Sequence, residues 1–546
     1  MKEDKSLVIR GNLVDILKRR TYGAEIHIGN GRIQQVIETG QEEKGYLLPG
    51  FIDAHVHIES SMTTPAAFIR AAVRHGNIGA VADPHEIANV LGTEGIDYMI
   101  DNAKELPFYT WFGAPSCVPA TTMETSGATI DAEETARLLD REDIHFLAEM
   151  MNYPGVLNND PEVARNIEAA QKRGKRVDGH YPQAAGERLK AYIAAGISTD
   201  HETITLEEGR EKCALGMRVL IREGSAARNF EVLHPLLKEY PEQVMFCTDD
   251  AHPCLLDEGY INESVKRALA LGYDLYDVLR AASYNPAQHY GIPVGFLREN
   301  DPADLILVND LSELRILATY IQGTCVYDGE KCLLPFPTPR PINRFGAKPI
   351  TPEKLTVKVK GKRQMRVIVC EGGGLITQEQ ICPIHTPDGI VESDPSRDIL
   401  KLVIVNRYRK TPPAVAFLKG TGIKLGAVAQ SITHDSHNII AIGATDFELT
   451  QAINAVIQSK GGIAVSLLDE VSLLPLPIAG LMSDRTLEET SRLYREIEQK
   501  IKRLGTSLES LQMTLSFMGL LVIPALKLSD QGLIDSNQFQ FTPLFV

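Results

Sequence analysis

Short apolar segments rich in β-branched residues alternate along much of the chain with longer segments of helical periodicity. Apolar runs bounded by turn residues are typical of strands in a parallel sheet, and apolar positions three and four apart are typical of amphipathic helices. We predict eight strands, at residues 50–57, 78–83, 108–114, 145–151, 176–180, 197–201, 218–223 and 244–249. Helices are predicted between them, at residues 64–75, 132–141, 161–173 and 229–240. Pro65 and Pro161 suit the first turns of two of these helices.

This repetition of strand and helix predicts an α/β fold. Eight βα units over about 200–250 residues match the size of a TIM-like (β/α)8 barrel, which we assign to residues 49–300. The active site of such a barrel lies where its strands end at their C-termini. The residues at those ends therefore decide which chemistry the barrel can support.

Histidines and carboxylates stand at the predicted ends of five strands. His55 and His57 are two residues apart in a strand, so their side chains point to the same side. The full set is His55, His57, Glu149, His180, His201 and Asp249. A single histidine at a strand end is usually structural, but six nitrogen and oxygen ligands together favour a metal site. They exceed the needs of one tetrahedral metal, which predicts two metals bridged by Glu149 and a hydroxide.

The composition is that of a globular protein. The 546 residues are 44% hydrophobic and 23% charged, and the length favours two or more folding units. The formal net charge of -15 argues against nucleic acid or an anionic membrane as partner and favours a small molecule. Residues 1–10 are charged and lack the apolar core of a secretory signal, so we predict a cytoplasmic protein. Eight cysteines without a Cys-x-x-Cys pair are expected to be reduced thiols.

Five motifs resemble the bacterial type of adenine deaminase within the amidohydrolase superfamily. They are Pro-Gly-Phe-Ile-Asp-Ala-His-Val-His-Ile-Glu-Ser-Ser (49–61), Asp-Pro-His-Glu-Ile-Ala-Asn-Val (83–90), Asp-Gly-His (178–180), Thr-Asp-His-Glu (199–202) and Thr-Asp-Asp-Ala-His-Pro (248–253). The His-x-His motif alone is typical of the superfamily, whereas the residues after it and residues 83–90 point to adenine deaminases. The resemblance runs nearly end to end.

The resemblance implies conversion of adenine to hypoxanthine and ammonia at a dinuclear site active with manganese or iron. Many superfamily members bridge their metals with a carbamylated lysine, whereas this chain has Glu149 in that place, as adenine deaminases of this type do. The ligand types suit manganese, iron and zinc alike, and we predict two divalent ions, Mn²⁺ first, with Fe²⁺ or Zn²⁺ as alternatives. We further predict adenine and water as partners, a homodimer and a role in purine salvage.

Deamination also needs carboxylates that move protons. Asp249 is predicted to take the proton from water and return it, and is chosen over the adjacent Asp250 from the family pattern. Glu86, just after the second strand, is predicted to hold the purine edge and pass protons. The sequence does not decide which of these two carboxylates performs each transfer.

Asp83 and His85 are predicted to bind substrate or to orient Glu86, and Glu59, in the loop above the barrel, is predicted to bind substrate by shaping the purine pocket. Structural roles remain open for each position. Asp83 could cap a helix whose dipole Glu86 favours, and the loop at Glu59 could be the start of the helix that contains Pro65.

Two further domains are predicted outside the barrel. Residues 24–36, with a turn at Gly29-Asn30-Gly31, and residues 303–308 and 324–334 suggest hairpins. In the superfamily the chain ends that flank the barrel pair as a small β-sandwich, so we assign residues 1–48 and 301–345 to one discontinuous domain. A proline-rich linker at 335–352 precedes a C-terminal α/β domain at 351–546. Its predicted strands lie near 355–359, 366–369, 399–405 and 439–442, and its helices at 446–458 and 484–502.

A histidine-rich loop, His434-Asp435-Ser436-His437-Asn438, stands out in the C-terminal domain. It could form a triad-like or metal-binding site, with the loop closing over the barrel mouth as one concrete possibility, or be a polar loop before a strand. The glycine clusters at 372–374 and 420–422 lack the spacing of phosphate-binding loops, so we predict turns there.

Two other functions remain open. A cyclic-amide hydrolase of the dihydroorotase or hydantoinase kind shares the barrel and the metals but usually uses the modified lysine, so Glu149 argues against it. A non-catalytic relative that serves as an assembly scaffold would be expected to lose ligands, and all six predicted ligands are present.

Overall fold

Eight parallel strands form a closed barrel in the first part of the chain. The strands are β5 (Phe51–Val56), β6 (Asn77–Ala82), β7 (Tyr109–Ala114), β8 (Phe146–Met150), β9 (Arg176–Gly179), β10 (Thr199–Asp200), β11 (Arg218–Arg222) and β12 (Val244–Cys247). A bridge between Val177 and Ile197 joins β9 to the segment of β10, and one between Val56 and Asp249 closes the ring. All eight predicted strands, and the barrel fold, are confirmed.

The computed structural model describes residues 7–225, 227–386 and 389–546. The sequence prediction for the charged segment 1–10 falls partly outside the described residues, because residues 1–6 are not among them. Strand β1 begins at Leu7. The described residues divide into two compact units: residues 7–84, 97–116 and 131–338 form the first, and residues 85–96, 117–130 and 339–546 form the second. Among these residues, no helix combines the length and apolar character that crossing a bilayer requires.

Helices accompany the barrel strands in the sequence. Three of the four predicted helices are confirmed as α1 (Pro65–Ala72), α4 (Ala132–Leu139) and α6 (Pro161–Lys172). The prediction of one helix at 229–240 is wrong, because the segment forms α9 (Phe230–Leu233) and α10 (Leu236–Glu239) on either side of Pro235. Proline lacks an amide hydrogen and its ring collides with the preceding turn, which interrupts the helix. Further helices of this unit are α7 (Gly186–Ala194), α8 (Leu206–Ala214), α11 (Pro253–Glu258), α12 (Ile261–Ala270), α13 (Leu275–Leu279) and α14 (Asn285–Tyr290).

The segments on either side of the barrel pair in one seven-stranded sheet of order β15-β14-β13-β4-β1-β2-β3. Its strands are β1 (Leu7–Asp15), β2 (Arg20–Gly29), β3 (Arg32–Glu38), β4 (Tyr46–Leu48), β13 (Leu305–Val308), β14 (Ile316–Ile321) and β15 (Thr324–Tyr327). The predicted turn at Asn30-Gly31 joins β2 and β3, with both residues at positive φ. Antiparallel pairing of β13 with β4 connects segments more than 250 residues apart, and a shared apolar core that includes Ile26, Ile33 and Leu305 lies against them.

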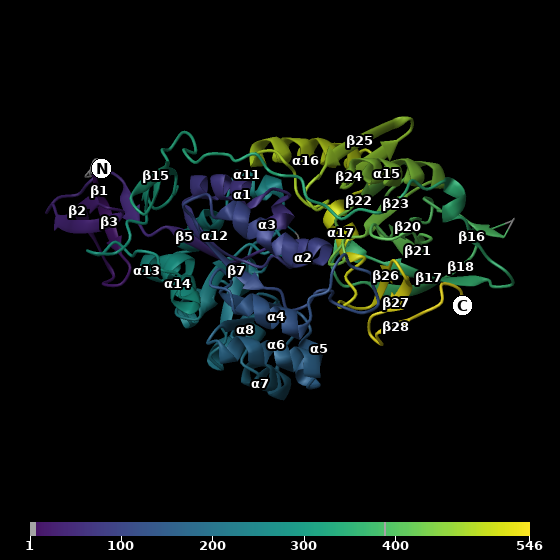
Figure 1. Ribbon diagram of the computed structural model, residues 1–546, viewed down its shortest axis with the longest axis horizontal. Helices are drawn as coiled ribbons and strands as arrows, with labels where there is room; N and C mark the ends of the chain where they lie inside the picture. Colours follow the sequence, from purple (N-terminus) through teal and green to yellow (C-terminus); the bar gives the residue numbers. More distant parts are fainter. Residues whose placement is uncertain (1–6, 226, 387–388) are drawn as a thin grey trace. The chain divides into compact units, whose positions relative to one another are not determined.

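The second unit contains an eight-stranded sheet of order β18-β17-β21-β20-β23-β22-β24-β25 (Figure 1). The strands are β17 (Gln364–Val369), β18 (Gln378–Pro383), β20 (Ile399–Val405), β21 (Ala414–Lys419), β22 (Ala427–Gln430), β23 (Ile439–Gly443), β24 (Gly462–Leu467) and β25 (Glu470–Pro475). Helix α15 (Asp446–Ser459) packs its apolar side on this sheet, where Ile453 and Val456 are fully buried. The unit also contains β16 (Val357–Lys358), β19 (Ile390–Val391), β26 (Leu526–Ser529), β27 (Gly532–Asp535), β28 (Gln540–Phe541), α2 (His85–Leu91), α16 (Leu487–Lys502) and α17 (Leu511–Phe517). The four strands and two helices predicted for this region are present.

Candidate metal centre

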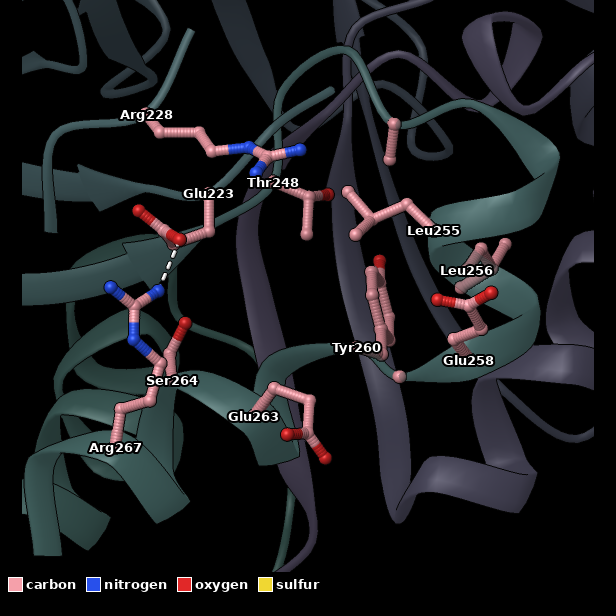
Figure 2. A pocket seen from close by; sticks show the side chains of 12 residues that line it. Glu223, Arg228, Thr248, Leu255, Leu256, Glu258, Tyr260, Glu263, Ser264 and Arg267 are labelled. Atoms are coloured by element: carbon pink, nitrogen blue, oxygen red, sulfur yellow. Dashed lines mark hydrogen bonds and ion pairs between the residues drawn. The ribbon is translucent and has the colours of Figure 1, made fainter. Parts of the chain in front are cut away.

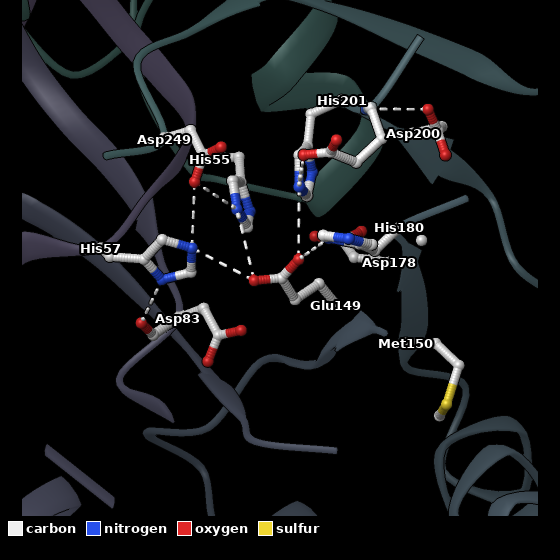
Figure 3. Close-up of polar contacts among 12 residues, drawn as sticks. His55, His57, Asp83, Glu149, Met150, Asp178, His180, Asp200, His201 and Asp249 are labelled. Atoms are coloured by element: carbon white, nitrogen blue, oxygen red, sulfur yellow. Dashed lines mark hydrogen bonds and ion pairs between the residues drawn. The ribbon is translucent and has the colours of Figure 1, made fainter. Parts of the chain in front are cut away.

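Six side chains converge at the C-terminal ends of the barrel strands (Figure 3). Two of them lie within strands, His55 in β5 and Glu149 in β8. The other four follow strands: His57 after β5, His180 after β9, His201 after β10 and Asp249 after β12. The structure therefore brings together all six residues that the sequence predicts as ligands. Their roles as ligands stay a prediction.

The carboxylate of Glu149 lies between two sets of imidazoles. Its Oε1 is 3.1 Å from His57 Nε2 and 4.0 Å from His55 Nε2. Its Oε2 is 2.6 Å from His180 Nδ1 and 3.2 Å from His201 Nε2. Because each oxygen faces a different set of histidines, the carboxylate is placed as a bridging ligand would be.

Asp249 completes the cluster from the opposite side. Its Oδ1 is 3.1 Å from His57 Nε2 and 3.7 Å from His55 Nε2, while its Oδ2 is 2.5 Å from a guanidinium nitrogen of Arg222. The backbone of Asp249 has φ of 57°, a left-handed conformation that Asp tolerates better than most residues. The adjacent Asp250 instead accepts a hydrogen bond from the Ser60 hydroxyl. Asp249, and not Asp250, is therefore the carboxylate that faces the imidazoles.

The tautomer of His57 suits metal binding. Its Nδ1 lies 3.1 Å from the backbone carbonyl oxygen of Asp83, which can only accept a hydrogen bond, so Nδ1 carries the proton. The lone pair of Nε2 is then directed to the carboxylates of Glu149 and Asp249. Fixing one ring nitrogen by a carbonyl is how proteins commonly orient a ligand histidine.

Burial makes this cluster costly without a cation. Burial by itself raises the pKa of Glu149, but the neighbouring imidazoles, His180 first, hold it well below its usual value. Burial likewise raises the pKa of Asp249, and Arg222 and His57 outweigh it and hold the pKa well below its usual value. Both ring nitrogens of His55 and Nε2 of His180 are buried without a hydrogen bond in the described part of the chain. Buried nitrogens and ionised oxygens that face one another fit divalent metal ions.

Two buried aspartates support the strands that carry the ligands. Asp53 accepts hydrogen bonds from the backbone amides of His55, at 3.1 Å, and Thr248, at 3.2 Å. Asp178 accepts hydrogen bonds from the hydroxyls of Thr199, at 2.9 Å, and Tyr290, at 2.8 Å. Burial raises the pKa of each carboxyl group to about 7. Both aspartates thus join neighbouring strands directly behind the metal centre.

A buried ion pair lies behind His201. Lys212, fully buried in α8, has its Nζ 2.8 Å from Asp200 Oδ1 and 2.7 Å from Glu208 Oε1. Asp200 in turn accepts hydrogen bonds from the amides of Tyr181 and Glu202, at 2.7 and 2.9 Å. Lys212 therefore neutralises the carboxylate that orders the backbone just after two predicted ligands, His180 and His201.

Two buried cations near the metal centre, Arg222 and Lys212, are not among the residues predicted from the sequence. Arg222 is buried at the end of β11 and contacts both Asp249 and Glu202. A charged residue at the end of the apolar run 218–222 was the signal that could have identified it. Lys212 gave no such signal, because a lysine on an amphipathic helix is usually exposed.

The residues predicted to contact substrate are divided between the two units. Asp83 follows β6, and Glu59 lies in a short helix, Ile58–Ser61, after β5; both are buried in the first unit. His85 and Glu86 begin α2 and belong to the second unit, where both are buried. In that unit Glu86 contacts two imidazoles of the predicted histidine-rich loop, His434 and His437.

A cavity of about 300 Å³ lies elsewhere on the first unit (Figure 2). Its lining includes Glu223, Thr248, Tyr260 and Arg267, and Arg267 pairs with Glu223. None of the described residues that line it is a predicted ligand. We therefore assign this cavity no part in the metal centre.

Comparison with known proteins gives matches along nearly the whole chain. Residues 46–326 match the model of the amidohydrolase family, and residues 374–540 match that of the adenine deaminase C-terminal domain. The adenine deaminase of Parabacteroides distasonis is 75% identical over 546 residues, which cover 100% of both chains. The adenine deaminases of Methanosarcina mazei and Salinibacter ruber are 48% and 49% identical, over 98% and 99% of this chain and 99% of each relative.

Proposed function

The chain belongs to the amidohydrolase family, among its adenine deaminases, and on this basis we propose that it converts adenine and water to hypoxanthine and ammonia. The observation that carries the proposal is the convergence of six buried ligand-type side chains around Glu149. The glutamate takes the place where cyclic-amide hydrolases usually have a modified lysine, which favours deamination over that alternative.

We propose that the cluster holds two divalent metal ions, with manganese as the active metal. The residues that would hold them are His55, His57, Glu149, His180, His201 and Asp249. Bound divalent ions lower the pKa of water toward neutrality and so supply a nucleophile for C6 of the purine.

Asp249 is proposed to move the protons of this reaction. Burial raises its pKa, but Arg222 outweighs this and keeps the carboxylate ionised, so it can accept a proton from water. Water supplies two protons: one passes by way of Asp249 to the departing amine as the C6–N bond breaks, and the other passes by way of Glu86 to a ring nitrogen, so hypoxanthine and ammonia form without a net gain or loss of protons. Arg222 stabilises the ionised carboxylate before the first transfer and after the second.

Glu86 is proposed to hold the purine edge and to transfer a proton to a ring nitrogen. Asp83, His85 and Glu59 are proposed to contact the base. Asp83 follows barrel strand β6 directly, and His85 and Glu86 come two and three residues after it in the chain. Their proximity in sequence to the end of a barrel strand supports this assignment.

The test is deamination by the pure protein after anaerobic loading with Mn²⁺. We expect adenine to give hypoxanthine and ammonia in equal amounts, and no turnover of dihydroorotate or hydantoin. Hydrolysis of a cyclic amide without deamination of adenine would refute the proposal. A protein that binds two metals but turns over neither substrate class would support the scaffold alternative instead.

The cellular setting remains a set of predictions from the sequence. We propose a cytoplasmic homodimer that acts in purine salvage, without nucleic acid or membrane partners. The net charge of -15 supports the choice of a small-molecule substrate over polyanions.

A further inference from the structure

The second unit contains a carboxylate held between two imidazoles. His434 Nδ1 lies 2.6 Å from Glu86 Oε1, and His437 Nε2 contacts Glu86 Oε2. The Glu86 side chain is 3% exposed and that of His437 is 1% exposed. Each oxygen of one buried carboxylate thus faces its own ring nitrogen, although more than 340 residues separate the partners in the sequence.

The hydrogen bonding of His437 determines which of its ring nitrogens carries the proton that faces Glu86. The backbone amide of Thr433 donates a hydrogen bond to His437 Nδ1 at 3.4 Å, so Nδ1 carries a lone pair. In a neutral imidazole the proton then resides on Nε2, the atom that faces Glu86. Burial lowers the pKa of His437, which favours this neutral form. Nε2, which like the two Glu86 oxygens has no hydrogen bond of full geometry in the described part of the chain, is therefore placed to direct its proton to the carboxylate.

The loop that carries both histidines is fixed at several points. His437 has φ of 51°, a strained conformation for a residue other than glycine that persists only where the surroundings impose it. The guanidinium of the buried Arg407 donates to the His437 carbonyl oxygen at 3.2 Å. Tyr408 donates to the Ser436 carbonyl oxygen at 2.6 Å, and the amide of Asn438 donates to the Thr125 carbonyl oxygen at 2.9 Å. Such bracing fixes the backbone that carries the His437 ring.

We propose that His434 and His437 are positioning residues that hold the Glu86 carboxylate in one orientation, ready to meet the purine. This inference rests on the proposed function, in which Glu86 contacts substrate. It also gives a role to the histidine-rich loop, which the sequence alone left open as either a functional site or a polar loop before a strand.

The other titratable groups near Glu86 are His85 and Asp435. His85 Nε2 is 3.7 Å from Glu86 Oε1 and 3.9 Å from Asp435 Oδ1, and His434 Nδ1 is 3.8 Å from Asp435 Oδ1. Burial raises the pKa of Glu86, but His434, His437 and His85 outweigh it and hold the pKa well below its usual value. Removing one imidazole is therefore expected to raise that pKa. A cation held by these same groups is the rival explanation.

The experiment compares apolar and conservative replacements at each histidine in the full chain loaded with Mn²⁺. His437→Leu and His434→Leu remove the ring nitrogens, whereas His437→Gln and His434→Asn keep an amide nitrogen near the same place. His385→Gln, at an exposed histidine of the same unit, is the matched control. We measure kcat and kcat/KM for adenine against pH, together with metal content.

We expect each Leu variant to lose about ten- to a hundredfold in kcat, the usual cost of removing a partner that orients a reacting group. The acidic limb of kcat/KM should move to higher pH, because Glu86 takes up a proton more readily. The His437→Gln and His434→Asn variants should recover much of the wild-type kcat and much of the wild-type position of the acidic limb. In a Glu86→Gln background the Leu substitutions should cost nothing further, which a merely structural role would not produce. Metal content should stay at two per chain.

Several results would overturn the inference. Positioning would be contradicted if the Leu substitutions lowered kcat as much in the Glu86→Gln background as in the wild type. It would also be contradicted if the acidic limb of the kcat/KM profile did not move, or if the Leu variants lost a third metal ion per chain. The two histidines are tested separately, so misfolding of one Leu variant leaves the other decisive, and misfolding of both would assign the loop to stability. Wild-type protein inactive on adenine refutes the proposed function and this inference with it, whereas an active wild type with unimpaired Leu variants refutes the inference alone.

Discussion

Lys212→Met removes the charge that neutralises two buried carboxylates behind the metal centre. Lys212 Nζ lies 2.8 Å from Asp200 and 2.7 Å from Glu208, and it also donates to the Tyr181 carbonyl oxygen at 3.0 Å. Methionine fills a similar volume but offers no donor. The substitution therefore leaves two anions in a site that water does not reach.

The expected cost follows from this burial. Removing one partner of a buried ion pair costs about 3–5 kcal/mol, because the remaining charge is uncompensated. A loss of that size corresponds to a fall in the thermal midpoint of about 5–10 °C. The surface pair Lys172–Glu168, whose side chains are 67% and 58% exposed, provides the matched control. Lys172→Met should cost less than about 0.5 kcal/mol.

The stability that Lys212→Met loses should also depend on pH. In the wild type, burial raises the pKa of Asp200 but Lys212 outweighs it, so the pKa lies below its usual value. A lowered pKa gives stability that is present above the usual pKa of aspartate and is lost only as the pH falls through the folded value. In the variant the two contributions of Lys212 are gone, and burial is opposed only by the weaker effects of His201 and the Tyr181 amide, so this pKa is expected to rise and the variant regains stability as the pH falls. The difference between the two proteins should be larger at pH 8 than at pH 5.5.

Thermal unfolding of metal-loaded protein at these two pH values measures the difference. Lys212→Met combined with Glu208→Gln should recover part of the loss, because one of the two stranded charges is removed. A Lys212→Met protein as stable as Lys172→Met, or a difference that grows toward acidic pH, would refute the reasoning.

Four other perturbations test the metal centre and the reaction. Glu149→Gln should lower metal content and turnover together, measured by metal analysis and hypoxanthine release, and an active variant with two metals would contradict its bridging position. Glu86→Gln should keep both barrel metals and lose turnover, and normal turnover would show that its assigned role is wrong. Arg222→Met should raise the pKa of Asp249 and move the acidic limb of kcat/KM to higher pH, whereas an unchanged limb would exclude the influence of Arg222 on that carboxylate. Chelation should lower the thermal midpoint by several degrees and Mn²⁺ should restore it, because bound metal compensates the buried ligands; an unchanged midpoint would contradict this.

The barrel could be predicted from the sequence because its pattern is local. Each strand is a short apolar run followed by a helix, and five of those runs end near a metal-type residue, so counting repeats places the ligands together without knowledge of their contacts. The break at Pro235 was also readable in principle, since proline interrupts a helix wherever it falls in the interior. The error lay in giving apolar periodicity more weight than this one residue.

The second unit was harder to predict because its sheet is mostly antiparallel and its strands pair across long separations. Strands such as β18 and β25 expose much of their length and lack long apolar runs, so periodicity alone did not reveal them. The contact of Glu86 with His434 joins residues far apart in the sequence, and no spacing rule connects them. Arg222 was missed for a related reason, because its buried state depends on carboxylates from other strands.

The proposed reaction requires a pair of cations bound at the Glu149 carboxylate. Anomalous diffraction from crystals of the Mn²⁺-loaded protein, recorded at the manganese absorption edge, tests this most directly. We predict two peaks, both within bonding distance of Glu149, one toward His57 and the other toward His180 and His201. A single peak, or peaks remote from Glu149 and Asp249, would contradict the account.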